Sequence, residues 1–88
     1  MPYIKQEERK ELDAAILPLI EVLKKAPPEK LDGWMNYTIT KLLKNVYKKK
    51  YFSLNRAIGV LTSVLLEFYR RVVAPYEDEK IKENGDVE

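Results

Sequence analysis

The strongest constraint on the fold is a row of six large apolar residues in the second half of the chain. The row consists of Leu54, Ile58, Leu61, Leu65, Phe68 and Val72. The residues follow one another at intervals of four, three, four, three and four, which keeps all six on one side of an α-helix. We call this row the long seam. It predicts a helix over residues 53–74, with Ser53 as its N-cap and Pro75 ending or kinking it.

Two further rows with the same kind of spacing come before the long seam. They predict helices over residues 7–25 and 33–48. The rows are Leu12, Ile16, Leu19 and Leu23, followed by Met35, Ile39, Leu42 and Val46. Pro18 lies inside the first row, where the helix either kinks or ends near Leu17 with a second helix starting at Pro18; a kink is favoured because the apolar row continues through it. Residues 29–33 are expected to form a turn, with Asp32 as an N-cap for the second helix.

A short fourth helix is predicted after Pro75. Proline suits the first helical position, and the acidic run Glu77-Asp78-Glu79 suits the positive end of a helix dipole. The chain of 88 residues is therefore expected to be a single all-α domain, a small helical bundle of three main helices plus a short C-terminal helix. Residues 1–5 are expected to form an extended arm, and residues 84–88 a frayed tail. The three apolar rows should face one core.

Composition excludes several kinds of chemistry. The chain has no cysteine and no histidine, so it lacks disulfides, reactive thiols and the commonest general base. Its net charge of +2, with both signs interspersed, does not favour nucleic acid as a partner. No run approaches the ~20 apolar residues of a membrane span, and the N-terminus lacks the apolar segment of a signal peptide. We expect a cytoplasmic, non-enzymatic protein without a cofactor and without membrane contact.

The length of the chain predicts self-association. A domain of this size buries only about 60–65% of the surface of its unfolded chain, so its core is thin. A homodimer or a higher assembly would supply the missing burial.

The predicted central helix also carries small and polar residues on its other side. Gly59 costs about 1 kcal/mol relative to alanine in a helix, so a neighbouring group is expected to approach closely there. Two interpretations remain open: a second helix packed on the small residues, or a groove that binds an anionic, nucleotide-like ligand. The residues assigned to such a ligand are Asn55, Arg56, Gly59, Ser63, Arg70 and Arg71, with Tyr47 and Tyr51 stacking on a base. No residue is assigned to catalysis or to a metal.

Five carboxylates support a competing interpretation. Glu7, Glu8 and Glu11 match the pattern EExxE, and Glu29 with Asp32 matches ExxD. This order resembles the magnesium site of all-α nucleoside triphosphate pyrophosphohydrolases, which implies hydrolysis assisted by Mg²⁺. That site requires ExxD inside a helix, whereas a turn is predicted here. A purely structural protein-interaction module is the third alternative.

Four segments give the chain a resemblance to a family of small phage and prophage proteins with no established activity. The segments are residues 31–33 (LDG), residues 36–43 (NYTITKLL), residues 54–61 (LNRAIGVL) and residues 67–87 (EFYRRVVAPYEDEKIKENGDV). The resemblance implies the cytoplasm of an infected or lysogenic host cell and a host protein as a candidate partner. Residues 54–58 (LNRAI) are also similar to a segment of small helical phage proteins that sequester cyclic-nucleotide immune signals, which implies an anti-defence role. This chain differs from those proteins in its longer acidic C-terminal segment.

Overall fold

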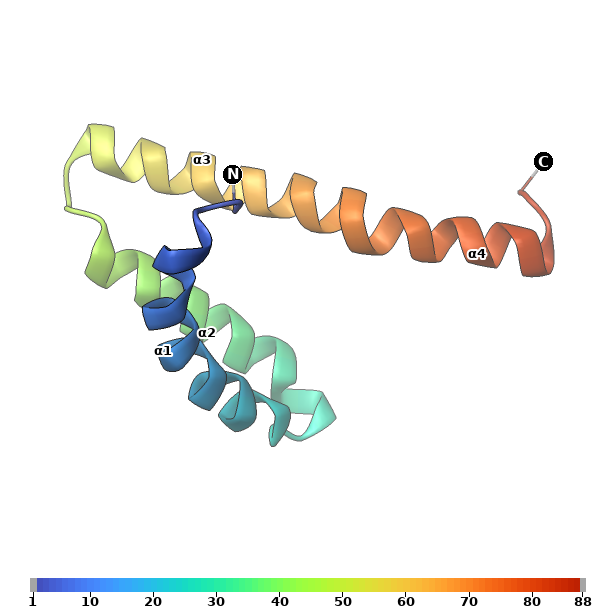
Figure 1. Ribbon diagram of the computed structural model, residues 1–88, viewed down its shortest axis with the longest axis horizontal. Coiled ribbons are helices and arrows are strands. Elements are labelled where there is room, and N and C mark those ends of the chain that lie inside the picture. Colours follow the sequence, from blue (N-terminus) through green and yellow to red (C-terminus); the bar gives the residue numbers. More distant parts are fainter. Residues whose placement is uncertain (1, 88) are drawn as a thin grey trace.

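The computed structural model describes residues 2–87 and confirms the all-α fold. Its elements are α1 (Gln6–Lys24), α2 (Pro28–Val46), α3 (Tyr51–Phe68), the π-helical turn η1 (Tyr69–Val73) and α4 (Ala74–Asn84). No strand is present within the described residues. Figure 1 shows α1 and α2 as a hairpin beneath the first half of α3, while α4 extends away from the hairpin. Residues 2–5 lie outside any helix and lead from α1 toward α3.

Two prolines of the hairpin lie within helices without interrupting them: Pro18 is inside α1, and Pro28 is the first residue of α2. α2 begins at Pro28, so the predicted turn at 29–33 and the N-cap at Asp32 are wrong. Proline suits the first turn of a helix because an N–H at that position would have no partner. Glu29 in the same turn complements the helix dipole. α1 continues through Pro18 as one helix.

The second half of the chain is one continuous helical rod formed by α3, η1 and α4 (Figure 1). The rod begins at Tyr51, and its N-cap is Lys50 without a capping side chain, so the predicted cap at Ser53 is wrong. Pro75 neither ends nor breaks the rod. The five-residue π-helical turn precedes it, and such turns accommodate a lost backbone hydrogen bond within a helix. The Tyr69 hydroxyl donates to Glu77 Oε1 at 2.7 Å, which connects the turn to α4.

The rod ends at the start of the predicted C-terminal tail. Asn84 is the last residue of α4, and Gly85 follows with a φ of 87°. This left-handed angle favours glycine because a side chain would be strained there. The backbone N–H of Gly85 donates to the carbonyl of Ile81 at 2.8 Å and caps the last turn.

Packing within one chain is sparse. Only Ala57 is buried among the described residues, and most of the long seam is exposed, as at Leu65 (66%) and Ile58 (63%). The prediction that three apolar rows face one core is therefore wrong for α3, whose seam lies largely open. The principal packing between separate helices is that of α1 against α2. The radius of gyration is 16.6 Å, against about 12 Å for a compact domain of this length.

None of the helices within residues 2–87 has both the length and the apolar character needed to cross a membrane.

Candidate functional site: a groove along α3

The α3–η1 rod and the N-terminal arm enclose a groove of about 770 Å³. Its floor includes Gly59, Ser63, Glu67 and Arg71, which follow one another at steps of four residues and so lie along one face of the rod. The remaining lining residues are Pro2, Tyr3, Tyr47, Arg56, Val60, Val64, Phe68 and Val72. The groove therefore has a narrow polar floor, apolar walls and a tyrosine from each of two other segments.

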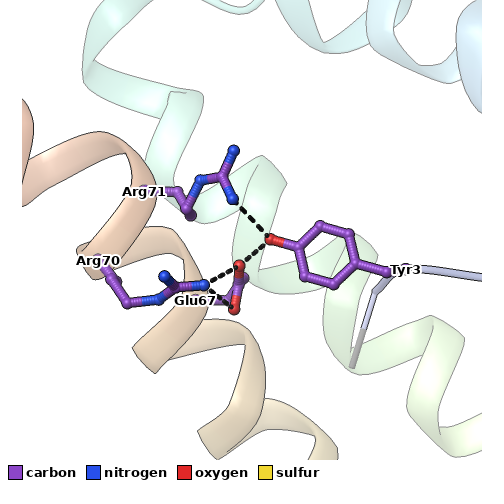
Figure 2. Close-up of polar contacts among 4 residues, drawn as sticks. All are labelled: Tyr3, Glu67, Arg70 and Arg71. Atoms are coloured by element: carbon purple, nitrogen blue, oxygen red, sulfur yellow. Dashed lines mark hydrogen bonds and ion pairs between the residues drawn. The ribbon is translucent and has the colours of Figure 1, made fainter.

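The arm is held on the rod by a polar cluster at one end of the groove. Figure 2 shows the Tyr3 side chain pointing from the arm toward Glu67 and Arg71. The Tyr3 hydroxyl donates to Glu67 Oε1 and accepts from Arg71 Nη1 at 3.4 Å. Arg70 Nη2 donates to both oxygens of Glu67, at 3.1 and 3.4 Å. The arm itself is tied to α1, because the Arg9 guanidinium donates to the carbonyl of Ile4 at 2.8 and 3.0 Å.

These contacts change the titration of the groove's single lining carboxylate. The hydrogen bond from Tyr3 and the positive charge of Arg70 lower the pKa of Glu67 below its usual value. The same hydrogen bond raises the pKa of Tyr3 above its usual value, because the protonated phenol is the donor. At neutral pH Glu67 is therefore ionised, with its charge engaged by Tyr3 and Arg70.

The two arginines that line the groove are free of carboxylate partners. Neither Arg56 nor Arg71 forms an ion pair within residues 2–87. Arg56 instead lies near the Phe52 ring, with its Cζ 5.9 Å from the ring centroid. Fifteen residues of helix separate the two arginines, or about 22 Å along the rod. Both ends of the groove therefore carry a guanidinium without a direct ion pair, the side chain best suited to bind phosphate through two hydrogen bonds.

The structure brings five of the eight predicted ligand residues together. Arg56, Gly59, Ser63, Arg71 and Tyr47 line the groove. The other three, Asn55, Arg70 and Tyr51, lie outside it. Asn55 projects from the rod about 100° away from Arg56, and Tyr51 is 84% exposed. Arg70 is engaged with Glu67 instead.

The expectation of a close neighbour at Gly59 is not met within the chain. A Cβ placed at Gly59 would have no atom within 4 Å. The space above this glycine is open, as the groove requires.

Sequence reasoning missed the arm and the carboxylate as parts of the groove. Glu67 is the third member of the four-residue row from Gly59 to Arg71, so the helical period alone could have found it. Tyr3 could not have been found in this way, because it lies 64 residues away from Glu67 in sequence.

The five carboxylates of the pyrophosphohydrolase pattern do not converge within one chain. Glu29 and Asp32 do lie inside a helix, near the start of α2, contrary to the predicted turn. Glu7, Glu8 and Glu11 lie near the start of α1. Because the two helices form an antiparallel hairpin (Figure 1), the two groups are at opposite ends of it. No cluster of three carboxylates suited to a metal ion occurs within the described part of the chain.

Comparison with known proteins places the chain in a family. The sequence profile of a domain of unknown function, DUF6899, matches residues 1–87, and the chain belongs to this family. No curated protein and no solved structure matches the chain.

Proposed function

We propose that this member of the family is a small, non-enzymatic binding protein that holds an anionic, nucleotide-like ligand in the α3 groove. The observation that carries the proposal is the pair of arginines, Arg56 and Arg71, which line the groove without carboxylate partners. Tyr3 and Tyr47 also line the groove, and their aromatic rings are suited to stack on a nucleotide base. A ligand with phosphates and bases would use both features.

The biological setting that fits this activity is interference with a host signal. The resemblance to phage and prophage proteins supports a role in the cytoplasm of an infected or lysogenic cell. There the protein would sequester a nucleotide signal or block a host defence protein. The small-residue floor at Gly59 and Ser63 supports the first of these roles, because it leaves room for a ligand against the helix.

Thermal-shift measurements and titration calorimetry with cyclic di-AMP, ATP and pyrophosphate test the proposal. We expect at least one of these probes to bind. Arg71→Ala should then weaken binding by about 10- to 100-fold, since a hydrogen bond to a charged group contributes about 1.5–3 kcal/mol. Lys82→Ala is the control, because this lysine of α4 does not line the groove. Gly59→Leu should abolish binding by filling the open space.

The outcomes separate the alternatives. Equal loss of affinity in Lys82→Ala and Arg71→Ala would contradict a site in the groove. The absence of binding by every probe would favour a purely structural protein-interaction module. Mg²⁺-dependent release of pyrophosphate from nucleoside triphosphates, lost in Glu8→Gln, would identify a pyrophosphohydrolase instead.

A further inference from the structure

α3 has the composition of a core helix but the exposure of a surface helix. Only two of its 18 residues, Arg56 and Glu67, are charged. A helix that is apolar on nearly all sides is normally buried. Within one chain only Ala57 of α3 is buried, and Ile58 and Leu65 of the long seam are each more than 60% exposed. The cover that this helix needs is not supplied by its own chain.

The exposed surface of the whole chain gives the scale of the missing contact. The chain exposes 8400 Å², whereas a compact monomer of 10.3 kDa exposes about 5400 Å². The difference is about 3000 Å² per chain, and a permanent homodimer interface buries about 1000 Å² or more from each partner. The surplus is therefore large enough for a permanent interface.

Charge at the two ends of the long seam indicates which partner fits. Lys48, Lys49 and Lys50 lie just before the seam, four to six residues ahead of Leu54. Glu77, Asp78 and Glu79 lie just after it, five to seven residues beyond Val72. If two copies of the seam align antiparallel, the lysines of each copy meet the carboxylates of the other. A parallel alignment would place lysines against lysines and carboxylates against carboxylates.

We infer that the long seam is the interface with a second copy of this chain, packed antiparallel. Leu54 of one copy then lies beside Val72 of the other, and Lys49 lies beside Glu77. The contact is isologous, so both ends carry the same complementary charges. The hydrogen bond from Tyr69 keeps the Glu77 carboxylate near η1, close to the end of the seam. This inference does not depend on the proposed ligand, although Phe68 and Val72 of the seam also line the groove, so the second copy would border it.

The mass in solution tests the surface. Light scattering of the full chain should give at least twice the chain mass of 10.3 kDa, and Leu65→Asp should reduce it to a monomer. Leu66→Asp is the matched control: this residue has nearly the same exposure, 64%, but lies off the seam. Its mass should match that of the unchanged chain. A monomeric unchanged chain, or equal dissociation in both variants, would overturn the inference.

Cysteine cross-linking tests the orientation, and it remains informative if Leu65→Asp fails to fold. The chain has no native cysteine. Leu54→Cys mixed with Val72→Cys should form a disulfide between the two variants under mild oxidation, because antiparallel packing brings these positions together. Neither variant should cross-link to itself. Disulfides between two copies of the same variant, and none between the two different variants, would mean parallel packing and would overturn the inference.

Charge reversal provides a test that leaves the apolar seam untouched. Lys49→Glu and Glu77→Lys should each weaken the assembly, and the double variant should regain the affinity lost by the singles. Additive weakening in the double variant would contradict the pairing of these two ends.

Discussion

At the scale of single residues, Gly59 distinguishes an open helix face from an occupied one. Alanine in place of a mid-helix glycine stabilises a helix by about 1 kcal/mol when nothing touches the new methyl group. The space above Gly59 and above Gly33 of α2 is equally open within the chain. We expect Gly33→Ala to raise the free energy of unfolding by up to that amount, as measured by urea denaturation. We expect Gly59→Ala to give a similar gain but to weaken ligand binding.

The comparison between these two glycines also shows what the sequence could establish at this scale. The sequence alone identified Gly59 and Ser63 as groove residues, because small residues at helical spacing leave room for a group to lie against the helix. It could not separate Arg70 from Arg71, which differ by one position and therefore by about 100° around the rod. In the structure Arg71 lines the groove and contacts Tyr3, whereas Arg70 pairs with Glu67 and lies outside the lining. If Gly59→Ala left binding unchanged, the groove floor would lie elsewhere.

At the scale of elements, the N-terminal arm is held by a pair of groups that titrate at opposite ends of the pH range. The lowered pKa of Glu67 means that docking contributes stability above the usual value of 4.5 and loses it as the pH falls through the lower folded-state pKa. The raised pKa of Tyr3 means that docking contributes below 10.0 and is lost as the pH rises through the higher folded-state pKa. The arm should therefore be fully docked across the neutral range.

Carbon NMR of the Glu67 carboxyl group measures this docking directly. We expect its pKa to lie below 4.5 in the unchanged chain and to rise in Tyr3→Phe, which lacks the donating hydroxyl. Arg70→Ala should give a smaller rise, because Tyr3 is the larger cause of the shift. An unchanged pKa in Tyr3→Phe would mean that the arm does not dock on the rod in solution.

Helix positions could be predicted from the sequence better than helix ends. The three apolar rows correctly located α1, α2 and α3, since each row spans a helix that the structure contains. The errors lie at Pro28, Ser53 and Pro75. Proline is compatible with three settings: the end of one helix, the first turn of the next helix, or a widened turn within a continuous helix. The residues around the proline are similar in all three settings, so the sequence does not distinguish them. The long-range contact of the arm had no periodic signal.

At the scale of the whole molecule, the apolar rows do not say whether their cover comes from the same chain or from another. The sequence correctly predicted α-helices with apolar faces, and it expected the long seam to face a core shared with the other two rows while also suiting self-association. The structure leaves that seam largely exposed. The helical period of apolar residues shows which side of a helix is apolar. It does not show how many chains share the core, because that number depends on the total surface and the length of the chain.

An assembly that shares its core must lose stability on dilution. When folding and association are linked, a tenfold increase in chain concentration favours the assembled state by about 1.4 kcal/mol, which corresponds to a rise in melting temperature of about 3–6 °C for two chains of this size. Calorimetry of the unchanged chain over a hundredfold concentration range should show this rise. Leu65→Asp, which removes the seam contact, should melt at a lower temperature that no longer depends on concentration. Because Ala57 is the only residue between positions 2 and 87 that one chain buries, its melting should also be broad and weakly cooperative. A sharp transition at one temperature throughout the range would mean that the single chain carries its own core.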